Sequence, residues 1–498
     1  MTIYKIDSDI TGLRIAKEDS LKVLPTTPIW VAYEPNSYSD FGAKVTSISR
    51  ETINPSRQRK FGGVTNIDVT AGFTMDLTQS NHIDLFEGFF FADKIAQINA
   101  NPSAVTATTF TVSNSTSFKA NHLIYCHGFT NAGNNGLKKI ISIANGKLTV
   151  ASAVAETTPP ADANVEVVGH EFTASKMDVK LSGNIPYLKI DSTATDKFTD
   201  LSLSAGDWIY LGSDTTSNKF ANNSGFARIK TISDFELYFD KTSWTPVTEI
   251  GNAKSIRLFC GTIIKNRIGD DIKRKTFQFE RTLGKDADGT QSQYVLGVIA
   301  NELTINFKQS DKITLDMTFV GCDNETRSGS TAPKSDSGTK KSIVDGKILN
   351  TSNDFHRIAI SKIDTSKSVA DPLCIYTTDL SLKISNNLSP NKALGTLGNV
   401  DISAGDFHVD GNITAYFTEI SAIEAVRNNV KVTLDAIIYS DNSGILFDVP
   451  LINIGNAQPA IEKNKEITIP LDIVATESEY HHTLLYSNFA YLPSAAGN

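Results

Sequence analysis

Residues that mark disulfide scaffolds, membrane spans and secretion are scarce in this sequence. Its 498 residues include four cysteines, Cys126, Cys260, Cys322 and Cys374, none of them in a C-x-x-C spacing, and this usage is typical of a reduced compartment. No stretch approaches the roughly 18 consecutive apolar residues of a membrane-spanning helix. The N-terminal residues also lack the basic and apolar regions of a signal peptide. We therefore expect a soluble protein that is not secreted and has no membrane partner.

An excess of positive charge is also absent. The chain carries 47 lysines and arginines against 55 aspartates and glutamates, a formal net charge of −8. A protein that wraps DNA neutralises phosphates with Lys and Arg, so this charge argues against that class. It is compatible with DNA that passes by without being held, because an acidic or neutral wall does not attract phosphates.

Catalytic signatures are missing from the printed sequence, which has no G-x-S-x-G, Walker loop, H-E-x-x-H or Rossmann glycine pattern. His122, Cys126 and His127 lie in NHLIYCHG, but a zinc site needs about four convergent ligands. The 286–289 segment, DADG, lacks the remaining acids of a calcium loop and favours a hairpin turn. The 481–482 histidine pair lies in an aromatic tail without further ligands. We predict no enzyme activity, no metal and no cofactor.

Strand patterns dominate what is present. Alternating or β-branched runs recur along the chain, among them TTFTVS, KTFQFER, ELTINF and EITIPLDIVA, and such runs are typical of strands. Helical periodicity is confined to short segments near 82–91 and 420–428. The sequence predicts an all-β protein with short helices.

An internal repeat occupies the Asn- and Thr-rich middle of the chain. LIY at 123–125 returns as WIY at 208–210, and KLTV at 147–150 returns as ELYF at 236–239, with matching order and intervals. A period of this kind indicates a repeated structural unit. We expect two small β-domains, A at 98–172 and B at 173–260.

The flanking regions show a second, more distant repeat. NIDVTAG at 66–72 resembles NVDISAG at 399–405, and a short apolar helix is expected after each. Aligning Gly72 with Gly411 gives an alternative register, and the sequence leaves both open. The expected organisation is a duplicated β-sandwich or barrel domain whose first copy is interrupted by the two small domains: 1–97 with 261–326, a linker at 327–342, and 343–498.

A basic loop lies in the first copy. Arg50, Arg57, Arg59 and Lys60 flank Pro55 in ISRETINPSRQRKFGG. As a nucleic-acid patch the loop has few aromatic residues for base stacking, and a solvated flexible loop is the simplest interpretation. We favour a third interpretation, contact with an acidic surface on a neighbouring subunit.

Taken together, ISRETINPSRQR, GFTMDLTQSNHIDLFEGFFFA, the hairpin FQFERTL…QYVLGVIANELTINF and LSLKISNNLSPNKALGTLGNVDISAGDFHVDGNITAYF resemble bacteriophage tail tube (major tail) proteins. The resemblance is to the subfamily with two fused tube domains, and it does not cover the two small inserted domains. It implies a structural subunit of a virion tail, made in the host cytoplasm. The implied assembly is a set of stacked homo-oligomeric rings, trimeric with pseudo-sixfold symmetry, that form a hollow conduit for DNA. The implied partners are tape measure, tail terminator and tail-tip proteins.

The resemblance also gives expectations for single residues. Along the strands near 302–320 and 466–475, apolar and polar side chains alternate, so one face can pack a core while the other meets water. We expect Thr304, Asn306, Asp316 and Asp472 to face the lumen. The basic loop, Arg50, Arg57, Arg59 and Lys60, becomes the candidate contact between stacked rings, and the inserted domains are expected on the tube exterior.

Two other function classes stay open at this point. A carbohydrate-binding tail-tip or adhesin-like protein would use the inserted repeats for glycan contact. A secreted hydrolase is the weakest alternative, because both a signal peptide and a convergent acid/base pair are missing.

Overall fold

The computed structural model of the chain is built almost wholly of strands. It describes residues 11–173, 177–251, 254–286, 289–343, 346–363, 371–374, 376–418 and 420–497. Two short α-helices occur in these residues, near the two segments whose periodicity predicts them. The all-β prediction is confirmed.

The first half of the main body is assembled from both sides of the insertion. Its strand β21 bends, so that one end belongs to the sheet β3-β4-β22-β21 and the other to the sheet β24-β2-β1-β20-β21-β23. Together these elements are half one: β1 (Gly12–Lys17), β2 (Ile29–Tyr33), β3 (Ser37–Arg50), β4 (Lys60–Asp76), α1 (Ile83–Phe90), β20 (Phe277–Asp286), β21 (Gly289–Lys308), β22 (Thr314–Gly321), β23 (Asp323–Gly329) and β24 (Thr339–Lys341).

The second half repeats this strand order in a continuous stretch. Here β27-β30-β33-β32 corresponds to β3-β4-β22-β21, and β25-β31-β32-β34 corresponds to β1-β20-β21-β23. Half two comprises β25 (Phe355–Lys362), β26 (Asp371–Cys374), β27 (Thr377–Ser385), β28 (Ser389–Asn391), β29 (Asp401–Ser403), β30 (His408–Tyr416), α2 (Ser421–Arg427), β31 (Val432–Ser440), β32 (Ser443–Gly455), β33 (Thr468–Ala475) and β34 (Leu485–Phe489). Strand β19 (Thr262–Lys265) leaves the insertion and pairs with β34.

Two sequence-based expectations are refined by these elements. The 66–72 segment lies inside β4, whereas 399–405 forms β29 and the bend after it. The strand that leads into α2 is β30, which contains Gly411, so the strand that corresponds to β4 lies around Gly411 and not at 399–405. The stretch expected as a linker, 327–342, contains the end of β23, a 3-10 turn at Lys334–Ser337 and β24, which pairs with β2.

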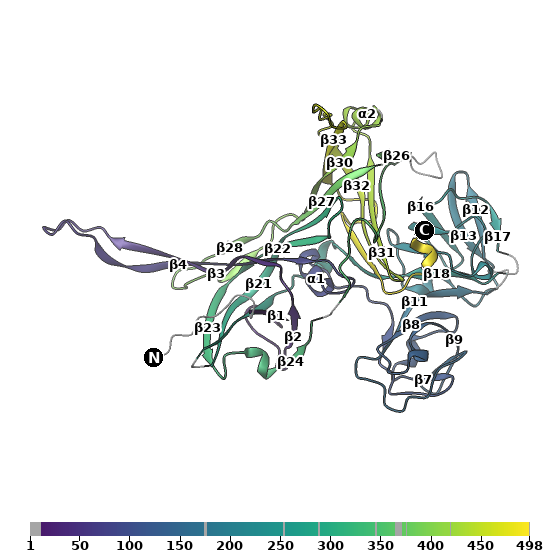
Figure 1. Cartoon of the computed structure of the whole chain (residues 1–498), viewed down its shortest axis with the longest axis horizontal. Helices are drawn as coiled ribbons and strands as arrows, with labels where there is room; N and C mark the ends of the chain where they lie inside the picture. Colours follow the sequence, from purple (N-terminus) through teal and green to yellow (C-terminus); the bar gives the residue numbers. More distant parts are fainter. Residues whose placement is uncertain are drawn as a thin grey trace.

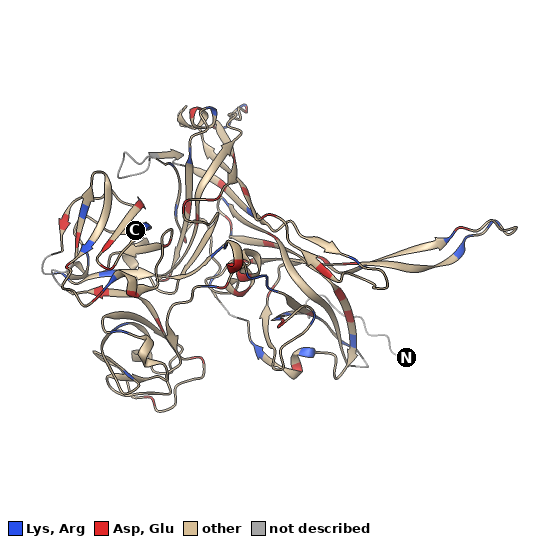
Figure 2. Ribbon diagram, turned by 180° about the vertical axis from the view of Figure 1, so that it is seen from behind, with Lys and Arg blue, Asp and Glu red and all other residues tan. Residues whose placement is uncertain are grey.

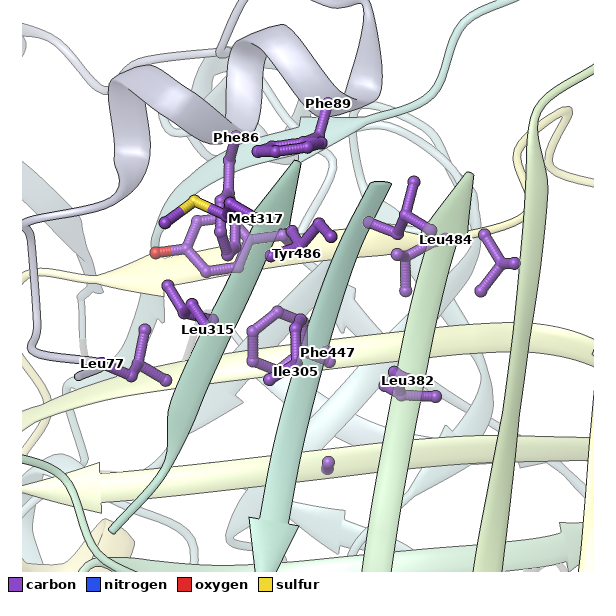
Figure 3. Packing of buried hydrophobic residues seen from close by; sticks show 14 of the residues in the cluster. Leu77, Phe86, Phe89, Ile305, Leu315, Met317, Leu382, Phe447, Leu484 and Tyr486 are labelled. Atoms are coloured by element: carbon purple, nitrogen blue, oxygen red, sulfur yellow. The ribbon is translucent and has the colours of Figure 1, made fainter. Parts of the chain in front are cut away.

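One apolar core runs through both halves. Helix α1 packs Phe86 and Phe89 onto the inner faces of β21, β22 and β27, and Phe447 and Tyr486 of half two reach the same cluster (Figure 3). The Phe86 and Tyr486 ring centroids lie 5.0 Å apart in an edge-to-face pair. The helix ends where Phe91 takes a left-handed conformation and its N–H binds the Glu87 carbonyl. Because the aromatic residues of one half fill the core of the other, the halves form a single packed unit.

The inserted residues build two further β-units, each with its own apolar core. Unit A orders its strands β11-β8-β9-β10-β7, and unit B orders its strands β18-β14-β15-β16-β13, so both follow one pattern. The two units join where β11 pairs with β18. Their strands are β5 (Asn99–Ala100), β6 (Ala104–Val105), β7 (Thr109–Thr111), β8 (His122–His127), β9 (Gly136–Ala144), β10 (Lys147–Val150), β11 (Asn164–Phe172), β12 (Met177–Ser182), β13 (Ile185–Ile190), β14 (Trp208–Leu211), β15 (Gly225–Ile232), β16 (Glu236–Thr242), β17 (Glu249–Ile250) and β18 (Ile256–Cys260).

A long two-stranded arm projects from the body. Strands β3 and β4 stay paired from Ser37↔Thr74 out to Arg50↔Lys60, and their distal part extends far beyond every other element (Figure 1). The corresponding position in half two holds the much shorter hairpin β28–β29. We call residues 45–64 the arm.

Candidate functional site

A polar sheet face crosses both halves of the body. Strands β4, β22, β21, β27, β30, β33 and β32 follow one another in ladder contact. In one row across them, Asn306 pairs with Ser381, Ser381 with Asn412, and Asn412 with Asp472. The alternate residues, such as Leu382 on β27, are buried in the shared core. The four residues predicted to face a lumen thus belong to one surface.

Within this face the predicted residues also touch one another. Thr304 pairs with Asp316 across the ladder. The Asn306 side-chain amide donates to Asp316 Oδ2 at 2.8 Å, and the Thr74 hydroxyl donates to Asp316 Oδ1 at 2.6 Å. Asp472 lies farther along, in the β33 part of the same surface.

The face is predominantly acidic. On β21, β22, β27, β30 and β33, its alternating positions carry five carboxylates, one on each strand, and two lysines, on β21 and β27. One of the lysines, Lys383, forms an ion pair with Glu302 across the β21–β27 contact at 2.9 Å. The carboxylates are Glu302, Asp316, Asp379, Asp410 and Asp472, and the lysines are Lys308 and Lys383.

The contact between β21 and β27 is where the two halves meet as one sheet. Seven consecutive antiparallel pairs join them, from Glu302↔Ser385 to Lys308↔Asp379. This contact closes the edge of half one with strand β27 of half two. The chain therefore contains one complete half-to-half joint.

Matching edges are left open at the two ends of this sheet. Among the strands that the structure describes, β3 pairs only with β4. At the opposite end, residues 453–455 of β32 pair only with β33 in the described part of the chain. By strand order, β3 is the counterpart of β27 and the end of β32 is the counterpart of the end of β21. An open edge of this kind is a template for pairing with another chain.

The arm carries the predicted basic residues. Arg50 ends β3 and Lys60 begins β4, and Arg57 and Arg59 lie in the turn between them. All four are exposed, and no acidic side chain of the described residues forms an ion pair with them. The ribbon in Figure 2 shows Lys and Arg on the arm, well away from the body. The structure thus collects these residues on one projecting element.

Unit B is fastened to half two by buried charges that the sequence analysis did not single out. Arg228 on β15 forms ion pairs with Asp448 on β32 at 3.0 Å and with Asp240 on β16 at 2.7 Å, and its side chain is 3% exposed. Lys241 on β16 forms an ion pair with Asp435 on β31. Burial raises the pKa of Asp448 and lowers the pKa of Lys241, as expected for charges removed from water.

A sequence signal for this contact exists in retrospect. Asp435 and Asp448 interrupt the apolar runs KVTLDAIIYS and ILFDVP, and a charge inside such a run is buried only when it is paired. Apolar residues extend the contact, since Phe226 of unit B packs edge-to-face on Phe489 of β34 with centroids 5.8 Å apart. The insertion therefore lies firmly against half two.

The remaining candidates show no convergent site in the described residues. His122 and Cys126 are buried in unit A, and burial lowers the pKa of His122 to about 4 and raises that of Cys126 to about 12. No group of three or more His, Cys, Asp or Glu side chains suited to a metal occurs in the described part of the chain. Of the 286–289 turn, residues 287 and 288 lie outside the described residues, and Asp286 pairs with Gly289 across it as a hairpin requires.

His481 and His482 do not act together. His481 is exposed and its Nδ1 lies 3.4 Å from Glu477, whereas His482 is buried, with Nδ1 3.2 Å from the Tyr480 carbonyl oxygen. None of the helices among the described residues is long and apolar enough to cross a membrane.

Comparison with known proteins identifies the family. The family model described as "Phage tail tube protein" matches residues 8–475, which includes both halves and the insertion between them. A search of curated proteins gives no match. The polar sheet face, the open edges and the arm are therefore features of a chain that belongs to the phage tail tube protein family.

Proposed function

We propose that this structural tail tube subunit closes into rings by repeating its internal β21–β27 joint between chains. The observation that carries the proposal is the pair of unpartnered edges that match the two sides of that joint. The end of β32 of one copy then pairs with β3 of the next. Pairing in this way removes exposed edges and closes the sheet into a barrel.

The ring we propose is trimeric with pseudo-sixfold symmetry. Each chain supplies two halves of equivalent strand order, so three chains supply six. A head-to-tail contact that uses two different edges is heterologous, and such contacts form rings when the rotation closes.

The polar face, with Thr304, Asn306, Asp316 and Asp472, is proposed as the wall of the lumen. Its carboxylates repel phosphates, so DNA can pass without being bound. The protein acts as a conduit and has no catalytic role. The insertion packs on the outer sheet of half two, through β31, β32 and β34, which is consistent with a place on the tube exterior.

Stacking of rings is assigned to the arm, with Arg50, Arg57, Arg59 and Lys60 as the contact residues. The end rings would meet the terminator and tail-tip proteins, and the tape measure protein would occupy the lumen before DNA. The exposed face of unit B carries Tyr187 and Tyr238, stacked with centroids 4.5 Å apart, and this aromatic pair is the surface we assign to any glycan contact. Synthesis in the host cytoplasm fits three described cysteines that are all unpaired, Cys126, Cys260 and Cys322.

Disulfide trapping tests the ring. We take Gly455 of β32 as the counterpart of Glu302 of β21, and counting through the ladders then makes Lys44 of β3 the counterpart of Ser385 of β27. The double variant Lys44→Cys with Gly455→Cys should therefore form, on oxidation, a covalent ladder that ends at the trimer on a non-reducing gel. Each single variant serves as the control and should stay monomeric on that gel. Rings seen by electron microscopy without any ladder would contradict the β32–β3 joint, and a ladder ending at another size would contradict the trimer.

A further inference from the structure

The two ends of β4 carry surfaces of opposite character. Lys60, at its start, belongs to the arm, and Asp76, at its end, lines a groove beside α1. At roughly 3.3 Å per residue, a strand of this length separates the two by about 50 Å. Copies stacked along the β4 direction would bring the arm of one to the groove end of the next.

The groove is an apolar hollow with an acidic rim. Its main cavity, about 420 Å³, is lined by apolar side chains of β1, β2 and β20, including Ile15, Val31 and Phe277. A second hollow of about 270 Å³ adjoins it and shares Val31 and Tyr33 as lining. The charged residues around the two are five acids, Glu18, Asp19, Glu34, Asp76 and Asp84, and two bases, Lys17 and Lys341.

Two of these acids are available for a partner. Asp19 and Glu34 are exposed, and no basic side chain of the described residues forms an ion pair with either. Asp84, by contrast, already has Lys17 and Lys94 at 3.3 Å. The rim therefore offers negative charge that no lysine or arginine in the described part of the chain neutralises.

The arm has the complementary composition. It carries four basic residues and one acid, Glu51. It also exposes apolar side chains that none of the described residues cover, with Phe61 97% exposed; the others are Val45, Ile48, Ile53 and Val64. An isolated two-stranded ribbon is marginally stable in water, and exposed apolar residues gathered on one element mark a contact surface.

We infer that the arm of a subunit in one ring docks into the β1–β2–α1 groove of a subunit in the adjacent ring. The inference rests on the proposed ring and names the surface that receives the arm. Apolar arm residues enter the hollow, while Arg57 and Arg59 meet Asp19 and Glu34 on its rim. Because the arm and the groove are different surfaces at opposite ends of β4, the contact is heterologous and does not close, so rings stack without limit.

Charge reversal tests the pairing. Arg57→Glu with Arg59→Glu, and separately Asp19→Lys with Glu34→Lys, should leave rings intact and reduce the protein found in tubes roughly tenfold or more, because like charges then face each other. Combining all four substitutions should restore tubes. The matched control, Lys147→Glu with Lys219→Glu on the inserted units, should form tubes as the unchanged protein does.

Each other outcome is decisive. Unchanged stacking in the arm variant would overturn the inference and leave the ring proposal standing. Loss of tubes in both variants without recovery in the combination would also overturn it, since the two surfaces would then have different partners. Normal tubes from the arm variant with impaired DNA passage would assign the arm to nucleic acid. Failure of the unchanged protein to form rings would overturn the ring proposal itself.

Trapping by a disulfide gives a second measurement. Ser56→Cys at the arm tip with Thr27→Cys in the groove should yield long covalent polymers from oxidised tubes and monomers from separated rings. The pair Ser56→Cys with Ser117→Cys, which places the second thiol on unit A, should give no polymer. Polymers from the control pair alone would place the arm on the insertion and overturn the inference.

Discussion

The two halves of the body share a strand order, but different segments cover the outer sheet of each half, which is β24-β2-β1-β20-β21-β23 in half one and β25-β31-β32-β34 in half two. In half one, the cover is the segment 332–341, which contains the 3-10 turn at Lys334–Ser337 and β24 and which we call the strap. Beneath it, the buried Glu280 accepts hydrogen bonds from the Ser335 hydroxyl at 2.6 Å and the Tyr294 hydroxyl at 2.8 Å. In half two, the outer sheet is covered by unit B, which brings Arg228 to Asp448. A buried carboxyl group on an outer sheet thus has neutral hydroxyl groups of its own half as partners in half one and a remote cation in half two.

This difference assigns a structural task to the insertion. In the sequence, the insertion that contains unit B lies between two segments of half one. The buried charges of unit B are nevertheless paired with residues of half two. These ion pairs therefore link the insertion, which is joined covalently to half one, to half two, in addition to any role of the insertion on the tube exterior. The halves also differ in the arm, which is long in half one and reduced to β28–β29 in half two. Each chain therefore contributes one long arm for every two halves.

The largest effect on stability is expected from removing the ion pairs between unit B and half two. Arg228→Met leaves the buried Asp448 without its arginine partner and should lower the free energy of unfolding by about 3–5 kcal/mol, measured by urea denaturation. Lys189→Met, which removes an exposed ion pair with Glu236 in the same unit, is the control and should leave the urea midpoint unchanged. Equal midpoints for the two variants would show that unit B is not held by these charges.

A smaller effect is expected from the strap of half one. Ser335→Ala removes a hydroxyl that donates to the buried Glu280 and should cost about 1–3 kcal/mol in the same measurement, because a buried carboxyl oxygen is left without this hydrogen bond. Ser337→Ala, on the exposed side of the strap, should change stability by less than about 0.5 kcal/mol. If Ser335→Ala lowered the free energy of unfolding as much as Arg228→Met does, the strap and unit B would not differ in how strongly they stabilise the sheet that each covers.

The effect that is smallest at neutral pH concerns the starts of the two helices. His82 precedes α1, buried with Nε2 2.7 Å from the Tyr486 hydroxyl, whereas Ile420 precedes α2. Burial lowers the pKa of His82 to about 3. Between that value and the usual pKa near 6.5, the unfolded chain binds a proton that the folded chain does not, so stability falls as pH decreases through this window.

Urea midpoints between pH 7 and pH 4 test this assignment. The variant His82→Gln should show a shallower loss of stability on acidification than the unchanged protein. Some slope should remain, because burial also lowers the pKa of His122 to about 4 and of His482 to about 3. An equal slope for His82→Gln and the unchanged protein would exclude His82 as a source of acid sensitivity.

The local patterns of the sequence were good guides to the strands. Alternation in ELTINF and KITLDMTFVG predicts strands with one apolar and one polar face, and Thr304, Asn306 and Asp316 do share a face of the sheet. The helix around 82–91 also follows from its apolar residues. These features depend on neighbours two to four positions apart, so a single sequence contains them.

The contacts between distant segments were not predictable in the same way. The NIDVTAG and NVDISAG match suggested one register, but the second segment lies in β29 and not in the strand before α2. The role of Asp448 was missed because its partner, Arg228, lies 220 positions away in a unit that the repeat pattern treats as separate.

By itself the sequence determined the all-β class, the repeated units, the basic composition of the arm and the polar alternation of the sheet, since each arises from local periodicity and composition. Only the tertiary structure decided that the halves share one core and one sheet, that unit B is bound to half two, and that an acidic groove lies at the opposite end of β4 from the arm. The physical reason is that burial and ion pairing depend on which segments meet in space, and those meetings are set by the packing of the whole chain.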